Sequence, residues 1–295
     1  MHSDWFIDLN VDNVKGTSTA RGHRSRFIDI LSDPSNSCID RVPNAGEIIN
    51  GHVVMHNGLL IEWPWRDTHD PERAKGYYGA FSEILRMNKG VHEPSEERMF
   101  ATVLKKGVSD GATMVELGSY WAFYSMWFYK AIKDAQIYCI EPVEEHLNMG
   151  ISHCKLNDVQ AKFTQGKADV LHQVIQENNI EYIDLLHADI QGGERELLKD
   201  ISSLLMERKI KYLFVSTHGD ECHYECIKHL EDHEYRIVAS ADCETETFCF
   251  DGIIVACHQD NLDVPFISLG NRRHTPLATH PLLSRDLGIL KFYDE

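Results

Sequence analysis

Short apolar runs alternate with helix-length segments through the middle of the chain. Two such segments lie at 143–156 and 193–207, and each joins one apolar run to the next. An alternation of strands and helices predicts a mostly parallel, doubly wound α/β sheet with right-handed crossovers. The predicted strands are Thr113–Leu117, 136–140, 161–164, 182–188 and 211–217.

The two ends of this pattern differ from its middle. Apolar runs at 236–239 and 248–255 flank a polar turn at 242–247, which predicts two strands paired as an antiparallel hairpin at the sheet edge. At the other end, Pro94 and neighbouring acids precede an apolar period. A helix is therefore predicted to open there, with acids in its first turn, and to end near Gly107.

These patterns divide the chain into three parts. Residues 90–258 form the predicted α/β domain. Residues 1–89 combine turn residues and aromatic residues without a regular period, which predicts an N-terminal cap or lid over that domain. Residues 259–295 contain three prolines and no clear period. A loop-rich C-terminal extension is predicted there, and it can provide a contact between two copies in a homodimer.

Composition narrows the class of protein. Hydrophobic residues make up 43% and charged residues 25% of the 295, which is ordinary for a globular protein. The net charge of −17, without a run of lysines and arginines, argues against nucleic acid as a partner. The first residues lack a signal pattern, and no apolar stretch reaches the roughly 20 residues that cross a membrane. We therefore expect a cytoplasmic protein with no membrane partner, and eight cysteines that are reduced thiols.

Candidate chemistry begins where the first predicted strand ends. Glu116 and Gly118 form an acid-x-Gly turn that leads into a helix, and ligands of open α/β sheets bind at such strand ends. Gly118 permits a tight turn and leaves room for a ligand, while Glu116 can meet a cationic amino group. Tyr120 and Phe123 replace the later glycines of the dinucleotide fingerprint. A nicotinamide-dependent oxidoreductase is therefore disfavoured.

A second acid follows one strand–helix–strand unit later. Glu141 ends the next predicted strand and is followed by Pro142. A carboxylate at that place can accept hydrogen bonds from both hydroxyls of a ribose. Either acid alone fits a solvated strand end equally well, but together with Glu116 in this register it predicts a nucleoside site.

The motifs around these acids resemble those of one family. The stretch from Glu116 to Ser125, the pair Glu141-Pro142, and residues 183–194 (Ile-Asp-Leu-Leu-His-Ala-Asp-Ile-Gln-Gly-Gly-Glu) resemble the FkbM family of S-adenosylmethionine-dependent methyltransferases. Residues 90–94 resemble a subgroup of it, and the resemblance covers about residues 76–240. It implies a Rossmann-like class I methyltransferase sheet with S-adenosyl-L-methionine as cofactor.

The resemblance also implies roles for individual residues. Contacts to the methionine side of the cofactor are expected along the first turn, contacts to the ribose at the second strand, contacts to the adenine on the loop after the third, and one residue beside the reacting methyl group. In that order they are Glu116, Gly118 and Ser119; Glu141; Lys167, Ala168 and Asp169; and Asp189. Tyr120, Ser125 and Pro142 are further expected cofactor-binding residues.

Four positions depart from the family pattern. Ala122 replaces a common glycine, and we expect its methyl group to be tolerated at a helical position. His187 and Gln191 stand where lysine and glutamate are usual, and Ser216 stands where a glutamate is common before His218. Catalytic details of the family therefore do not transfer directly.

Histidines near the strand ends are candidate bases. His218 follows the fifth strand and titrates in a range suited to removing a proton from a hydroxyl, with His187 and His92 as alternatives. Asp189 with His187 or His218 can instead hold a divalent cation, which we do not expect. The spacing of His218, Cys222, Cys226 and His229 allows a zinc site, but a helix that buries Cys222, Cys226 and Leu230 while His223, Glu225 and Lys228 face water explains it without metal.

The acceptor is expected to be a neutral or cationic small molecule, such as a sugar or a natural-product intermediate, methylated on oxygen. His92, Glu93, Trp63 and Trp65 are the candidate acceptor contacts, with the aromatic residues serving as a lid or packing the cap onto the core. Two alternatives stay open: methylation of nitrogen, and a module that binds S-adenosylmethionine without turnover.

Overall fold

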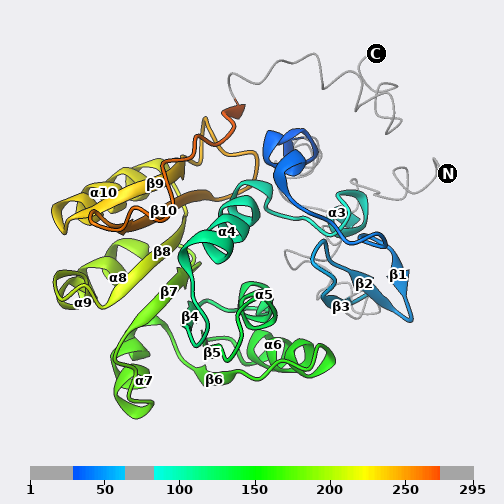
Figure 1. Cartoon of the computed structure of the whole chain (residues 1–295), viewed down its shortest axis with the longest axis horizontal. Helices are drawn as coiled ribbons and strands as arrows, with labels where there is room; N and C mark the ends of the chain where they lie inside the picture. The colour runs from blue at the N-terminus through cyan, green and yellow to red at the C-terminus, as the bar shows by residue number, and fades with distance from the viewer. Residues whose placement is uncertain (1–28, 64–82, 273–295) are drawn as a thin grey trace, which may run out of the picture.

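A computed structural model describes residues 29–63 and 83–272 of the chain. Within these residues the main sheet has seven strands in the order β6-β5-β4-β7-β8-β10-β9 (Figure 1). Their bounds are β4 Thr113–Leu117, β5 Gln136–Glu141, β6 Lys162–Gln165, β7 Ile183–Ala188, β8 Ile210–Thr217, β9 Tyr235–Ala241 and β10 Gly252–His258. The predicted doubly wound α/β class is confirmed.

The strand order reverses at β4. This first strand of the sheet pairs in parallel with β5 on one side and with β7 on the other. The chain therefore runs outward through β5 and β6, returns, and continues through β7 and β8. Such a reversal opens a crevice at the carboxyl ends of the strands, because the loops on either side lead away from each other.

The last two strands are a hairpin, but only one of them forms the edge. β10 pairs antiparallel with both β8 and β9, so it lies inside the sheet and β9 forms the border. β10 also begins at Gly252, four residues after the predicted start. The intervening Phe248 and Cys249 are buried in a loop, and the Asp242 carboxylate holds that loop through the amides of Thr245 and Glu246. An apolar pattern alone did not distinguish this buried loop from a strand.

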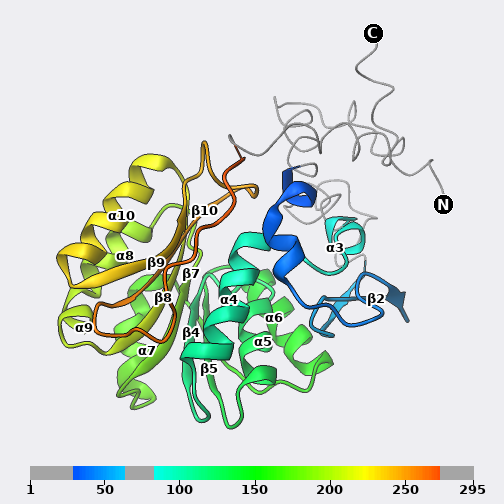
Figure 2. The same cartoon turned by 45° about the horizontal axis from the view of Figure 1, so that its top comes forward.

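Helices cover both faces of the sheet (Figures 1 and 2). The first face carries α4 Pro94–Gly107, α5 Phe123–Ala131 and α6 Glu144–Leu156. The second carries α7 Leu171–Glu177, preceded by η5 Ala168–Val170, and α8 Glu194–Asp200, α9 Ser202–Met206 and α10 Asp220–Asp232. The helix predicted at 193–207 is two helices, divided at the buried Ile201. Within the described residues no helix is both long and apolar enough to cross a membrane.

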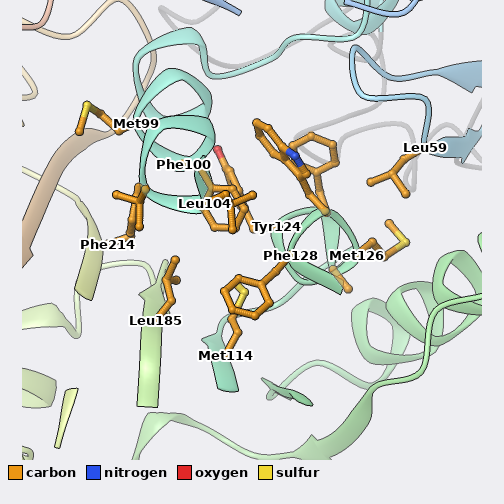
Figure 3. Close-up of a cluster of buried hydrophobic side chains, with 14 of the residues drawn as sticks. Leu59, Met99, Phe100, Leu104, Met114, Tyr124, Met126, Phe128, Leu185 and Phe214 are labelled. Carbon is orange, nitrogen blue, oxygen red and sulfur yellow. The ribbon is translucent and has the colours of Figure 1, made fainter. Parts of the chain in front are cut away.

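Side chains alternate between the two faces along each strand. Met114, Leu185 and Phe214 join the core on the first face, where they meet Phe100 of α4 (Figure 3). Their sequence neighbours, such as Val115, join the core on the second face. This period of two places Glu116, His187 and Ser216, each two residues after a first-face core residue, on the side of α4.

The N-terminal part has more regular structure than its pattern predicted. It contains η2 Pro34–Cys38, α3 Glu83–Met87 and a small antiparallel sheet of β1 Ile48–Ile49, β2 His52–Val54 and β3 Leu60–Glu62. Strands of two or three residues are too short to show an alternating period. Apolar residues of this sheet, such as Val53 and Ile61, join the same core as α4 and α5.

One buried amide joins this small sheet to the domain. Asn157, which caps the C-terminus of α6, accepts a hydrogen bond from the Leu60 amide and donates one to the Leu60 carbonyl, both at 2.8 Å. The Asn157 side chain thus pairs with β3 as a neighbouring strand would. We expect this pair of bonds to determine how β3 is seated on α6.

Replacing Asn157 by Ala should loosen that seat. The amide and the carbonyl of Leu60 would lose their hydrogen-bond partner while the neighbouring side chains still cover them. We therefore expect the free energy of unfolding in urea to fall by about 1–3 kcal/mol. Hydrogen exchange at the Leu60 amide should accelerate more than exchange in β4 does. Lys155→Ala, on the exposed side of α6, is the control and should stay within about 0.5 kcal/mol of the parent. Equal stability of the two variants would contradict the assignment.

Candidate functional site

A cavity of about 1200 Å³ lies at the carboxyl ends of the parallel strands, where the order reverses. It brings together most of the residues that the sequence singled out, from five separate segments. Those that line it are His92, Glu93, Glu116, Gly118, Ser119, Tyr120, Glu141, Pro142, Lys167, Ala168, Asp169, His187 and Asp189. The predicted location of the site is thus the observed location of the cavity.

Four predicted residues are not among those that line it. Ser125 is buried behind the wall and donates its amide to Glu116 at 3.1 Å, so it orients that acid. Trp63 packs against the apolar core instead. His218 lies behind Asp189, and Trp65 lies outside the described residues.

The turn after β4 is built on a close backbone contact. Gly118 has φ +73°, and a Cβ placed on it would lie 1.8 Å from the carbonyl oxygen of Asp189. The glycine therefore lets the ends of β4 and β7 approach each other, in addition to opening the cavity wall. Ala122, expected to be helical, instead has φ +59° and precedes α5. Ala122 is not helical because it precedes α5, at the point where the backbone changes direction before the helix begins.

Glu141 is held rigidly at the end of β5. Its carboxylate accepts hydrogen bonds from the amides of Tyr120 at 3.0 Å and Val143 at 2.9 Å. His146 Nδ1 lies 3.5 Å from it. Burial opposes ionisation, but the bonds from His146, Val143 and Tyr120 lower the pKa of Glu141 below its ordinary value. An ionised carboxylate with two oxygens at fixed positions suits a diol such as a ribose.

The floor of the cavity holds a different acid. Burial raises the pKa of Glu116 to about 7, and the charge of His187 and the bonds from Ser125 oppose the rise only partly. Nearby, Ser119 Oγ and His187 Nδ1 are buried and have no hydrogen-bond partner among the described residues, although His187 Nδ1 lies 3.8 Å from Glu116 Oε1. Unsatisfied polar atoms of this kind are rare in folded proteins, and at a cavity wall they suit a ligand.

A carboxylate from α4 completes the wall. Glu96 Oε1 lies 2.6 Å from His187 Nε2, and Glu96 Oε2 accepts a hydrogen bond from the Ser216 hydroxyl at 3.0 Å. Burial by itself lowers the pKa of His187, but the bond and charge of Glu96 raise it to about 9. The sequence predicted Glu96 only as an acid in a helical first turn. Its distance of 91 residues from His187 gives no local signal of the contact.

A second imidazole–carboxylate group lies where β7, β8 and β10 meet. His218 Nδ1 lies 3.0 Å from Glu194, and Nε2 lies 3.4 Å from Asp189 and 3.3 Å from Asp251. Burial by itself lowers the pKa of His218, but Glu194, Asp251 and Asp189 raise it to about 9. Sequence reasoning missed Glu194 and Asp251, since neither follows a parallel strand directly.

This arrangement bears on the role predicted for His218, which stays a prediction. An imidazole that is protonated at neutral pH and lies behind the lining residues is a poor direct base for a molecule in the cavity. Asp189 lines the cavity, and burial together with Asp251 and Glu93 raises its pKa to about 8. Asp189 and Asp251 line the cavity whereas His218 does not, so these two acids are the members of the group that a molecule in the cavity meets.

A third group connects the site to the N-terminal sheet. Glu97 is fully buried and lies 2.7 Å from His92 Nδ1 and 3.0 Å from His56 Nε2, which belongs to the β2–β3 connection. His92 in turn lies 3.3 Å from Glu93, whose carboxylate accepts the Tyr124 hydroxyl at 2.9 Å. Despite burial, His92 and His56 lower the pKa of Glu97. A charged residue so placed is stable only with these partners.

No group of three or more His, Cys, Asp or Glu side chains in the described part of the chain has the geometry to hold a metal ion. Cys222 and Cys226 are buried on α10, as is Leu230, while His218 precedes the helix. His223, predicted to face water, is also buried and contacts Thr217 at 2.8 Å and Ser240 at 2.9 Å. These two hydroxyls satisfy a ring that the helical period placed in solvent.

The chain was compared with known proteins. No family model and no curated protein sequence matches it. Among solved structures it is similar to a precorrin-6y C5,15-methyltransferase from Geobacter metallireducens (15% identity, 55% of this chain and 88% of that one, TM-score 0.42). It is also similar to a SAM-dependent methyltransferase from Aquifex aeolicus (17%, 53% and 88%, 0.37). A third is TrmK of M. capricolum in complex with S-adenosyl-homocysteine (12%, 58% and 69%, 0.40).

The buried histidines make stability depend on pH. An unfolded histidine loses its proton near 6.5, whereas His187 and His218 keep theirs to about 9. Below about 6.5 both states are protonated and the stabilisation is complete. Above it the folded state binds more protons, so the free energy of unfolding should fall by on the order of 1 kcal/mol per pH unit for each histidine up to about 9. The raised pKa values of Glu116 and Asp189 act in the same direction.

Urea unfolding at pH 6.5, 7.5 and 8.5 measures this decline. Glu96→Gln removes the carboxylate that holds the proton on His187, so its decline should be shallower as well as its stability lower. Asp110→Asn, an exposed acid outside the cavity, is the control and should follow the parent. Stability that stays level or rises over this range would refute the charged state assigned to His187 and His218.

Proposed function

We propose that this protein is an S-adenosylmethionine-dependent methyltransferase that methylates an oxygen atom of a small molecule. The cavity supports the proposal because its acids and unsatisfied polar atoms match the ribose and the methionine part of this cofactor. The FkbM motifs quoted above support it independently, because they lie on the residues that line the cavity. Glu141 carries the proposal: an ionised acid at the end of the strand next to β4 suits the ribose.

The remaining parts of the cofactor find complementary groups. Its methionine part carries an ammonium and a carboxylate. The carboxyl group of Glu116 suits the ammonium, while Ser119 Oγ and the charged His187 suit the carboxylate. Lys167, Ala168 and Asp169 line the cavity beyond β6 on the side proposed for the adenine. The residues present therefore fit the cofactor from end to end.

Asp189 is the proposed proton acceptor. When bound, S-adenosylmethionine supplies an electrophilic methyl group on a positively charged sulfur. Asp189 would take the proton of the acceptor hydroxyl, and the positive charge of the bound cofactor would lower the pKa of Asp189 and so favour the ionised carboxylate that this role needs. Asp189 receives a hydrogen bond from Gln191 at 3.1 Å and is flanked by His218, so its position is held from two sides. Alignment of this kind contributes about 7–11 kcal/mol to catalysis.

Calorimetric titration with S-adenosylmethionine, S-adenosylhomocysteine and NAD tests the cofactor assignment. Both sulfur compounds should bind and NAD should not, because the later glycines that admit a pyrophosphate are absent. Glu141→Gln should weaken both by about 10- to 100-fold, since it replaces a charged hydrogen-bond acceptor worth roughly 1.5–3 kcal/mol. Asp110→Asn should bind like the parent. If neither sulfur compound binds the parent protein, the proposed function is wrong.

The ratio of the two affinities tests Asp189 without knowledge of the acceptor. S-adenosylmethionine carries the sulfonium charge that S-adenosylhomocysteine lacks. Asp189→Asn should therefore weaken the first roughly tenfold more than the second, about 1.4 kcal/mol. In the parent, preference for the first should grow as pH rises through about 8 and Asp189 ionises. A ratio unchanged by Asp189→Asn at pH 8.5 would remove Asp189 from the reacting centre.

A further inference from the structure

The cavity has room for more than the cofactor. Pockets that bind one small molecule measure roughly 300–1000 Å³, and this one measures about 1200 Å³. Several lining residues have no part in the proposed cofactor site. They are Glu93 at the start of α4, Trp121 before α5, and Phe250 and Asp251 in the loop before β10. This second region is the acceptor end of the cavity.

The cavity as a whole is rich in carboxylates, and Glu93 and Asp251 belong to its acceptor end. Among the described residues that line the whole cavity, eight are acids and one, Lys167, is a lysine. Lys167 follows β6, on the proposed adenine side. The lining histidines nearest the acceptor end are already paired, His92 with Glu93 and Glu97, and His187 with Glu96. A negatively charged acceptor would therefore meet repulsion there.

The carboxylates of this region also act on one another. Burial raises the pKa of Asp251 to about 6, with the charge of Glu93 adding to the rise and that of His218 opposing it. Asp251 and Glu93 likewise raise the pKa of Asp189. Carboxylates that repel each other across a cavity are relieved by a cation between them.

Aromatic side chains complete the surroundings. Trp121 and Phe250 line the cavity, and Tyr124 lines it while donating its hydroxyl to Glu93. Ring faces attract cations, and together with carboxylates they form the usual environment of a bound ammonium group. The loop that carries Phe250 and Asp251 is fixed at its start by Asp242 and at its end by the pairing of Gly252 with Thr217.

We propose that the methyl acceptor carries a protonated amino group, bound between the carboxylates of Glu93 and Asp251 and beside the hydroxyl that is methylated. The acceptor class is then an amino alcohol or an amino sugar, and this inference rests on the proposed methyltransferase function. An ammonium group between Glu93 and Asp251 offsets the charges that raise the pKa of Asp189, so Asp189 ionises more readily and can take the hydroxyl proton. The amino group is not itself methylated, since its electron pair is held by the proton.

Three matched probes test the proposal on protein saturated with S-adenosylhomocysteine, so that the methionine-side acids are already occupied. Ethanolamine, ethylene glycol and glycolate share a hydroxyl and two carbons but differ in charge. Ligand-detected NMR at pH 7.5 and constant ionic strength gives their dissociation constants. Ethanolamine should bind at least tenfold more tightly than ethylene glycol, and glycolate should bind most weakly.

Variants locate the charge. Asp251→Asn and Glu93→Gln should each weaken ethanolamine at least fivefold and leave ethylene glycol unchanged, while Asp110→Asn should alter neither. Absence of ethanolamine binding, or equal binding of the three probes to the parent protein, would overturn the proposal without any variant. The first titration with S-adenosylhomocysteine separates the two failures. If S-adenosylhomocysteine does not bind, the proposed methyltransferase function is wrong. If it binds but the protein does not prefer ethanolamine, only the proposed acceptor class is wrong.

Discussion

Paired burial of carboxylates and imidazoles beneath the first turn of α4 is the constraint on which the rest of the structure depends. Glu96 and Glu97 both enter the interior, where Glu96 meets His187 from β7 and Glu97 meets His56 from the β2–β3 connection as well as the nearby His92. Removing one partner of such a pair typically costs about 3–5 kcal/mol, because the other charge stays buried. The N-terminal sheet, α4 and the end of β7 therefore hold their relative positions together.

That constraint also produces the electrostatic character of the cavity. Glu96 keeps His187 protonated, and a protonated His187 next to Glu116 makes one end of the cavity suited to a group with both charges. At the other end His218 lies next to three acids, Glu194, Asp189 and Asp251, which balance its positive charge. Eight acids line the cavity, and among its described lining residues Lys167 is the one lysine or arginine.

The backbone makes this arrangement possible at the point where the strand order reverses. Gly118 allows the end of β4 to lie against Asp189, which brings the turn after β4 and the proposed proton acceptor together. The same approach explains why Glu116 and His187 are neighbours in register. A side chain at position 118 would separate these groups. The geometry of the site and the packing of β4 against the end of β7 therefore both require glycine at this position.

Local patterns in the sequence determined the strands β4 to β8, the helix from Pro94 to Gly107, and the place of Glu116, Glu141 and Asp189 at strand ends. Those features depend on residues near in the chain, which a period of apolar positions or a turn glycine can report. Tertiary structure alone decided that Glu96 reaches His187, that Asp251 enters the cavity from a buried loop, and that His218 stands behind Asp189. Glu96 and His187 are 91 positions apart, and His218 is 24 positions from its partner Glu194. A buried charge looks the same in sequence as a solvated one until the fold supplies its partner.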